Sequence, residues 1–335
     1  MQTVYCSTEA ERRKLRFLYQ QSGIKQRYSV LADFGRPVQD WKFFPQSENL
    51  EPFPSLEQRM AVFHKHAPLL SVDAIRNCLD GVAHDHEITH LITVSCTGMS
   101  APGLDLQVLE LMDLSKNLVR TSVNFMGCYA AIHALKLADA FCKADKKSKV
   151  VIVCTELCTL HFQRENTIDS ITASLLFGDG SAAALITADE NNAPGLHLDA
   201  FYAEVVPKGK RDMAWELSST GFLMTLSGYV PDLIEADFAA IVDRSLQQSN
   251  RSASDVSGWC IHPGGKRILE AIQKSVHLDA ASLTASYQVL QQYGNMSSAT
   301  ILFVLKKLMQ EKREAIFGAA FGPGLTVETF TASTA

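Results

Sequence analysis

A cysteine at a predicted strand-to-helix junction is the residue in this sequence whose setting best suits covalent chemistry. Cys128 stands in the run Val-Asn-Phe-Met-Gly-Cys-Tyr-Ala-Ala over residues 123–131, where a short β-like stretch meets a glycine and an alanine-rich helix begins with the cysteine. A thiol in that position faces the unpaired N–H groups and the positive end of the helix dipole, which favour thiolate over thiol. Because free cysteines are often buried and seven others occur in the chain, Cys128 alone is also consistent with a structural role.

Two polar residues further along the chain are candidate partners of this thiol. His262 ends an apolar run and is followed by Pro-Gly-Gly, which predicts a side chain left free at a strand-to-helix turn, although a lone histidine so placed is more often structural. Asn295 follows a glycine and precedes a predicted helix, so on its own it is better explained as a helix N-cap. Taken together, the three residues favour a nucleophilic site over three unrelated structural roles.

The three residues and their neighbours resemble the Cys-His-Asn triad of type III polyketide synthases, the chalcone and stilbene synthase-like members of the thiolase-fold condensing enzymes. The resemblance covers about residues 88 to 330 and includes Phe-Gly-Asp-Gly at 177–180, His-Pro-Gly-Gly at 262–265, Gly-Asn-Met-Ser-Ser at 294–298 and Phe-Gly-Pro-Gly-Leu-Thr-Val-Glu-Thr at 321–329. The last of these motifs separates the family from the ketoacyl synthases that initiate fatty-acid synthesis.

This resemblance implies an α/β, thiolase-like fold in which two similar αβαβα halves stack in five layers. The N-terminal half, residues 1–190, would carry the nucleophilic cysteine, and the C-terminal half, residues 191–335, would carry the histidine and the asparagine.

The resemblance also implies a reaction. Cys128 would take an acyl group from a starter acyl-CoA, and His262 would pair with the thiolate and lower its pKa. Malonyl-CoA would lose carbon dioxide to give an enolate, whose oxygen the His262 ring N–H and the Asn295 amide N–H would stabilise as an oxyanion hole does. The enolate would then attack the acyl-enzyme and lengthen the chain by two carbons, towards a pyrone, resorcinol or phloroglucinol-like product. Neither a metal nor any cofactor beyond the CoA thioesters is implied.

The entrance of the reaction cavity is assigned by the same resemblance. Phe177 matches a gatekeeper phenylalanine that divides the CoA tunnel from the reaction cavity, with simple core packing as the alternative. A second gatekeeper phenylalanine is usual in the stretch that here covers residues 221–226. Counting back from Val-Pro at 230–231 puts Met224, and not Phe222, at that place.

Four further positions correspond to the lining of the elongation cavity. Ser297 matches a small cavity residue, and Trp215 stands where plant enzymes often have glycine. Cys158 and His161 occupy the places of two threonines, while Glu156 keeps a family carboxylate. We therefore expect a cavity that accepts a different starter, or stops after fewer extensions, than that of a flavonoid-forming relative. The starter, the number of extensions and the mode of ring closure do not follow from the sequence.

Basic residues near the N-terminus are the candidates for binding CoA phosphates, as they are in this family. Lys25 and Arg27, just beyond a predicted helix over residues 9–21, are better candidates than the basic residues of that helix, which are typical of a solvated face. The family also implies a homodimer, and Ala101 stands where relatives can send a side chain into the partner's cavity.

Composition agrees with a cytoplasmic enzyme. The chain has 335 residues, of which 47% are hydrophobic, and a net charge of -5, which argues against nucleic-acid or acidic-membrane partners. No apolar run approaches 18 residues, so neither a membrane span nor a signal peptide is expected. The eight cysteines form no CxxC pair and no disulfide framework, as expected in a reducing compartment.

The pattern of apolar residues predicts alternating strands and helices. Expected elements are a strand at 88–96, a helix at 104–114, a strand before Cys128 with a helix to 142, a strand at 150–155, a helix at 232–249, a strand ending at 262 and helices near 266 and 298. Family members start with an extra strand. Here that strand is either missing or formed by Thr3–Cys6.

Two other classes of function are considered beside the condensing enzyme. A Cys-His-Asn order also occurs in papain-like peptidases, but the sequence around Cys128 lacks their signature. A non-catalytic thiolase-fold scaffold or partner subunit is the other alternative. The histidines at 84, 86 and 90 suggest a metal site only weakly, because such short tracts lack a distant fourth ligand.

Overall fold

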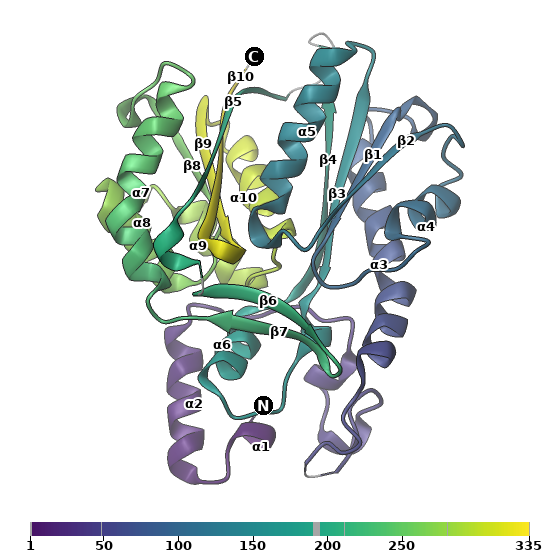
Figure 1. The fold of residues 1–335 in the computed structure, drawn as a ribbon, viewed down its shortest axis with the longest axis vertical. Helices are drawn as coiled ribbons and strands as arrows, with labels where there is room; N and C mark the ends of the chain where they lie inside the picture. The colour runs from purple at the N-terminus through teal and green to yellow at the C-terminus, as the bar shows by residue number, and fades with distance from the viewer. Residues whose placement is uncertain (1, 48, 190–194, 211, 280, 335) are drawn as a thin grey trace.

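The structure is a computed structural model that describes residues 2–47, 49–189, 195–210, 212–279 and 281–334. Two four-stranded sheets form its centre, and helices cover both faces of each sheet (Figure 1). A two-stranded hairpin and the N-terminal helices lie at one end of this arrangement.

The first sheet has the strand order β2-β1-β3-β4. Its strands are β1 (His90–Ser95), β2 (Val119–Asn124), β3 (Lys149–Leu157) and β4 (Asp179–Thr187), of which the first three run parallel and β4 runs antiparallel to β3. The run Val-Val-Ile-Val-Cys at 150–154 explains the central place of β3. Its side chains alternate between the core beneath the sheet and the core above it, so both faces are apolar, as is usual for a parallel strand covered on both sides.

The second sheet has the order β5-β10-β9-β8. Its strands are β5 (Leu196–Val205), β8 (Gly258–Ile261), β9 (Ala315–Gly322) and β10 (Thr326–Thr334). β10 runs antiparallel to both β5 and β9, while β8 runs parallel to β9.

Helices complete five layers. The middle layer consists of α5 (Ala130–Ala144) and α10 (Ala299–Gln310), which contact both sheets. The outer face of the first sheet is covered by α3 (Leu56–Leu79) and α4 (Leu104–Leu111), and that of the second by α7 (Val230–Gln247) and α8 (Lys266–Val276). The helix α9 (Thr284–Tyr293) lies between α8 and α10 in the chain. Four alanines of α5 are fully buried, because only small side chains let a helix approach two sheets at once. The predicted five-layer α/β architecture is confirmed.

The remaining elements lie at one end of the layers (Figure 1). They are α1 (Gln2–Tyr5), α2 (Glu9–Gln21), α6 (Ile168–Leu176) and the hairpin of β6 (Met213–Ser218) and β7 (Gly221–Leu226). The capping box of Thr8 and Glu11 starts α2, at the position predicted from the sequence. The alternative that Thr3–Cys6 forms a strand is wrong, because this stretch is largely helical and Tyr5 packs against Ser174 of α6.

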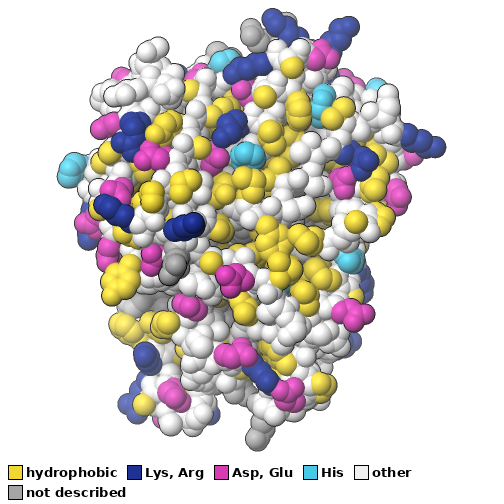
Figure 2. All heavy atoms as spheres, in the orientation of Figure 1, with side chains coloured by type: hydrophobic (Ala, Val, Ile, Leu, Met, Phe, Trp, Pro, Cys, Tyr) yellow, Lys and Arg dark blue, Asp and Glu magenta, His cyan; other side chains and the backbone are white. Residues whose placement is uncertain are grey.

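The other predicted elements are confirmed with small shifts of their ends. One difference matters for the site: the helix expected to begin with Cys128 begins at Ala130, after a 3₁₀ turn at Gly127–Tyr129. The described chain contains no helix that is long and apolar enough to cross a membrane. On the face shown in Figure 2, acidic and basic side chains are interspersed around a central group of hydrophobic ones.

Candidate active site

The nucleophile candidate lies on a tight turn between β2 and α5. Phe125 and Gly127 both have left-handed backbone angles, with φ of 57° and 81°. A Cβ atom on Gly127 would lie 2.3 Å from Cδ of Pro323, so only glycine allows the turn to pack against the Phe-Gly-Pro-Gly loop. The two motifs therefore meet directly beside Cys128.

Cys128 is brought together with the Gly-Asn-Met-Ser-Ser motif. Its thiol donates to Oδ1 of Asn295 at 4.0 Å and to Oγ of Ser297 at 3.7 Å. The Asn295 Oδ1 also accepts the backbone N–H of Ser297 at 2.8 Å, and its Nδ2 donates to the Gly264 carbonyl at 3.4 Å. Three segments more than 30 residues apart in sequence thus converge on one amide side chain.

The expectation that Cys128 is held as a thiolate is wrong for this geometry. Burial raises the pKa of the thiol to about 12, and the charge of Glu156 acts in the same direction. Hydrogen bonds with Ser297 and Asn295 lower the pKa but do not offset the burial. The 3₁₀ turn also places the sulfur before the first residue of α5, and the field of a helix falls off within its first turn.

His262 follows β8 and precedes α8, as predicted, but its side chain is enclosed rather than free. The residue is 1% exposed, and its backbone N–H donates to the Ala319 carbonyl at 2.9 Å. Burial lowers the pKa of the imidazole to about 3, so the ring is neutral. Among the described residues, neither ring nitrogen has a hydrogen-bond partner. The predicted pairing of His262 with the Cys128 sulfur is therefore not formed in this structure.

Asn295 is held by its backbone, and the alternative that it caps a helix is wrong. Its N–H donates to the Leu176 carbonyl at 2.9 Å, and its carbonyl accepts the N–H of Gly178 at 3.0 Å. These bonds form a short parallel bridge between Asn295 and Phe177. The following helix begins only at Ala299.

A buried carboxylate, Glu156, hydrogen-bonds to segments that lie next to Cys128 and Asn295. Glu156 is fully buried and accepts hydrogen bonds from the Cys96 N–H and the Thr97 hydroxyl, both at 2.9 Å, and from the Ser298 hydroxyl at 2.5 Å. Cys96 in turn accepts the Gly127 N–H through its sulfur at 3.0 Å. The roles of Cys96, Thr97 and Ser298 are not predicted by the sequence motifs. An acidic residue inside an apolar strand, which requires buried partners, was the available signal.

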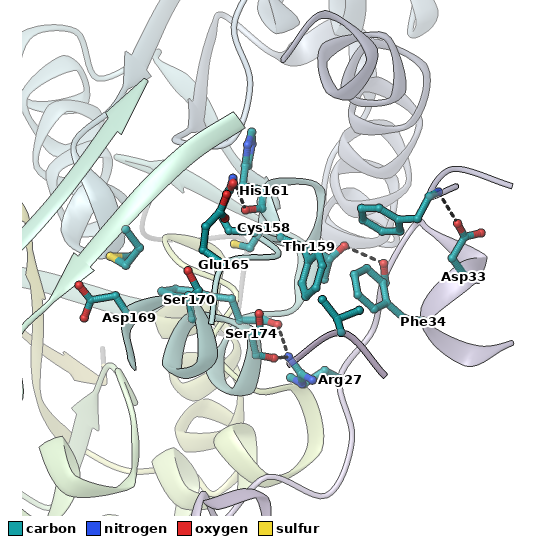
Figure 3. A pocket seen from close by; sticks show the side chains of 18 of the residues that line it. Arg27, Asp33, Phe34, Cys158, Thr159, His161, Glu165, Asp169, Ser170 and Ser174 are labelled. Atoms are coloured by element: carbon teal, nitrogen blue, oxygen red, sulfur yellow. Dashed lines mark hydrogen bonds between the residues drawn. The ribbon is translucent and has the colours of Figure 1, made fainter. Parts of the chain in front are cut away.

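A cavity of about 1240 Å³ lies between α6, the β6-β7 hairpin and the N-terminal segment. Of the residues predicted from the sequence, its lining includes Phe177, Met224, Trp215, His161, Cys158, Lys25 and Arg27. Figure 3 labels Cys158, His161 and Arg27 among them. The cavity does not include Cys128, His262, Asn295 or Ser297 in its lining. Phe177 belongs to both regions, because its side chain lines the cavity and its backbone pairs with Asn295.

Three aromatic side chains form the inner wall of this cavity. His161 accepts the Phe222 N–H at Nδ1 (3.0 Å) and donates from Nε2 to the Thr97 carbonyl at 2.7 Å; these partners assign its tautomer. The ring stacks on Phe222 at 4.1 Å between centroids and meets Trp215 edge-on. Trp215 donates its indole N–H to the Cys96 carbonyl at 2.7 Å. The cavity wall is thus hydrogen-bonded to Cys96 and Thr97, just beyond the end of β1, and Cys96 also accepts the Gly127 N–H of the turn that carries Cys128.

Comparisons with known proteins agree with this site. Residues 1–190 match the family "Chalcone and stilbene synthases, N-terminal domain", and residues 197–334 match its C-terminal domain. The chain belongs to the chalcone and stilbene synthase family. These type III polyketide synthases are acyltransferases that act as condensing enzymes. The alternative of a papain-like peptidase is therefore wrong.

Individual relatives of this type III polyketide synthase carry related names. The chain is 34% identical over 284 residues to "Alpha-pyrone synthesis polyketide synthase-like Pks18" of Mycobacterium tuberculosis, covering 82% of this chain and 72% of the relative. It is 32% identical over 325 residues to "Probable polyketide synthase 1" of Dictyostelium discoideum, covering 94% of this chain but only 10% of that protein.

Solved structures show the same fold. PKS-I from the brown alga Ectocarpus siliculosus superposes with a TM-score of 0.92 at 27% identity, covering 98% of this chain and 90% of the other. The 1,3,6,8-tetrahydroxynaphthalene synthase of Streptomyces coelicolor gives 0.88 at 26% identity, covering 99% and 94%. The predicted thiolase-like fold is confirmed.

Proposed function

We propose that this type III polyketide synthase loads an acyl group from a CoA thioester onto Cys128 and extends it with malonyl-CoA. The observation that carries the proposal is that the Cys128 thiol, the Ser297 N–H and the Gly264 carbonyl all hydrogen-bond to the Asn295 side-chain amide, in a chain of this family. His262, two residues before Gly264, presents from the same loop a neutral imidazole whose ring nitrogens have no hydrogen-bond partner in the described part of the chain.

In the loading step, the Cys128 sulfur attacks the thioester carbonyl and CoA leaves as a thiol. The Cys128 proton must move as the sulfur–carbon bond forms, because the raised pKa means that the thiol is the resting form. We propose His262 as the base for this transfer, which requires its ring to approach the sulfur, because the two are not hydrogen-bonded in this structure. Its two unpaired nitrogens leave one to accept the proton and one to bind the thioester oxygen.

In the extension step, malonyl-CoA loses carbon dioxide and the electron pair of the broken bond forms an enolate. The Asn295 Nδ2 and a His262 N–H would donate to the enolate oxygen. Because Oδ1 accepts the Ser297 N–H, Nδ2 is the end of the amide that can donate, and its long 3.4 Å bond to the Gly264 carbonyl is one that a charged oxygen would displace. The enolate carbon then attacks the acyl-Cys128 carbonyl and releases the sulfur.

The cavity beyond Phe177 is proposed to hold the growing chain and the CoA arm. Phe177 and Met224 would divide the two, while Trp215, His161, Cys158 and Ser297 would limit the product, with only Ser297 on the Cys128 side. Lys25 is the better candidate for a CoA phosphate, because its side chain is exposed at the cavity. The relatives' names mention an α-pyrone and a tetrahydroxynaphthalene, which supports an aromatic or pyrone product here.

Other parts of the proposal follow the family. CoA thioesters would be the only substrates, with no resident cofactor. We also propose a cytoplasmic homodimer and a division of labour between residues 1–190, which carry the nucleophile, and 191–335, which carry its two partners. The two sheets, which are formed from residues 90–187 and 196–334, support that division.

Intact-protein mass spectrometry with acyl-CoAs of several chain lengths tests the loading step. We expect an acyl adduct on the native protein, no adduct on Cys128→Ala, and an unchanged adduct on Cys142→Ala, a buried thiol on α5, the helix that follows the Cys128 turn. Carbon dioxide release from malonyl-CoA tests the second step and should fall much further than loading in Asn295→Ala. A native protein that neither loads nor decarboxylates would instead indicate the non-catalytic scaffold.

A further inference from the structure

Arg27 holds the backbone beside the catalytic asparagine. It lies in the N-terminal segment after α2, and its Nη1 donates to the carbonyls of Ser174 and Phe177, the second at 2.8 Å (Figure 3). These carbonyls lie at the C-terminal end of α6, where helix carbonyls lack partners within the helix and a positive charge is favourable. One guanidinium nitrogen is thus shared by two backbone acceptors.

Two motif glycines make room for the stem of this arginine. A Cβ on Gly294 would lie 2.7 Å from Arg27 Cγ, and a Cβ on Gly178 would lie 3.2 Å from Arg27 Cβ. The 2.7 Å contact would force a shift and the 3.2 Å contact would be unusually tight, since non-bonded carbons prefer about 3.5 to 4.0 Å. The arginine therefore passes between Phe-Gly-Asp-Gly and Gly-Asn-Met-Ser-Ser, two of the motifs that define this sequence.

The backbone that Arg27 holds is the same backbone that positions Asn295. The Leu176 carbonyl accepts the Asn295 N–H at 2.9 Å, and the Gly178 N–H donates to the Asn295 carbonyl at 3.0 Å. Leu176 and Gly178 are the chain neighbours of Phe177, whose carbonyl accepts a hydrogen bond from Arg27 Nη1. A shift of residues 174–178 would move the Asn295 amide relative to the Cys128 sulfur.

We propose that Arg27 is a positioning residue for the decarboxylation step and not a ligand of the CoA phosphates. This inference rests on the proposed function and departs from the role predicted for Arg27 from the sequence. A guanidinium whose nitrogen is occupied by two carbonyls has less capacity for a phosphate than the exposed ammonium of Lys25.

The test compares Arg27→Met with Lys25→Met and with Arg13→Met, an exposed arginine on α2. Methionine keeps an unbranched stem between the glycines but has no N–H to donate. We expect kcat for malonyl-CoA decarboxylation to fall about 10- to 100-fold in Arg27→Met, since an ångström of misplacement can cost that much. Its KM for malonyl-CoA and its acyl loading should stay within about threefold of native, given unchanged substrate contacts. Lys25→Met should raise KM instead, and Arg13→Met should behave as native.

Three outcomes overturn the inference. The first is a large rise in KM with unchanged kcat in Arg27→Met, which would make Arg27 a phosphate ligand. The second is an equal fall of loading and decarboxylation, which would make its role merely structural. The third is native behaviour. If Arg27→Met does not fold, Arg27→Lys, which keeps a single donor nitrogen, is tested in its place by the same comparison of kcat, KM and acyl loading with the native protein. A native protein that releases no carbon dioxide would overturn the proposed function itself.

Discussion

Replacing Gly127 by alanine should displace the turn that carries Cys128, which would slow acyl loading and lower the stability of the protein. Gly127 has φ of 81°, and its missing Cβ would lie 2.3 Å from Cδ of Pro323. Gly324, on the other side of that proline, has a similar φ of 74°, but no atom of the described residues lies within 4 Å of its missing Cβ. Alanine at either position suffers the same backbone strain, and only alanine at 127 also collides with a rigid ring.

The magnitudes follow from these two terms. The left-handed angle costs about 1 to 2 kcal/mol for any residue with a Cβ. The collision at Gly127 leaves the carbon about 1.2 Å short of an ordinary contact near 3.5 Å, and overpacking of this kind adds about 1 to 3 kcal/mol. Relief requires the turn to move by about an ångström, enough to slow a reaction of Cys128 about 100-fold.

The assay is the rate of acyl-adduct formation by intact-protein mass spectrometry, together with thermal unfolding of both variants. We expect Gly324→Ala to load at close to the native rate, with Tm lower by about 1 to 3 °C. Gly127→Ala should load about 100-fold more slowly and lose about twice as much Tm or more. Equal loading rates in the two variants would show that contact with Pro323 does not set the position of the nucleophile.

Three further predictions concern buried polar groups. Glu156→Leu leaves three buried donors, on Cys96, Thr97 and Ser298, without an acceptor, so Tm should drop by several degrees. Glu156→Gln keeps one side-chain oxygen and should lower Tm less. Equal losses of Tm in the two variants would contradict a stabilising role for these hydrogen bonds. His161→Leu should shift the product distribution of the enzyme, because it frees the hairpin wall from Thr97; an unchanged product profile by mass analysis would count against this. Acidification from pH 7 to 5 should destabilise the fold in urea titrations. The two buried histidines, His161 and His262, have pKa values lowered to about 3, so their stabilising effect is present above pH 6.5 and lost as pH falls, at up to about 1.4 kcal/mol per pH unit each. Asp179, with its pKa raised to about 6 by burial, opposes this between pH 6 and 4, because its folded form keeps a proton that the unfolded chain releases. A fold that becomes more stable at pH 5 would refute the sign.

Local pattern was sufficient for most of the scaffold. The helix at 9–21 was predicted to the residue because its cap and its first turn are consecutive in sequence. The strand at 150–155 followed from an unbroken run of apolar residues, which a doubly covered strand requires. By contrast, Thr3–Cys6 is too short for its own pattern to decide, and packing of Tyr5 on α6 made it helical.

The amino-acid sequence by itself determined which residue types stand in the site and in which motifs they occur. Only the tertiary structure decided how close they lie and which protonation state they adopt. The contact of Cys128 with Asn295 joins residues 167 positions apart, and the neutral state of His262 comes from the atoms of many segments that exclude water around it. Arg27 shows the same limit: its charge suggested a phosphate, but its carbonyl partners lie about 150 residues away. Burial and long-range contacts are properties of the whole packed chain, so no local pattern could have supplied them.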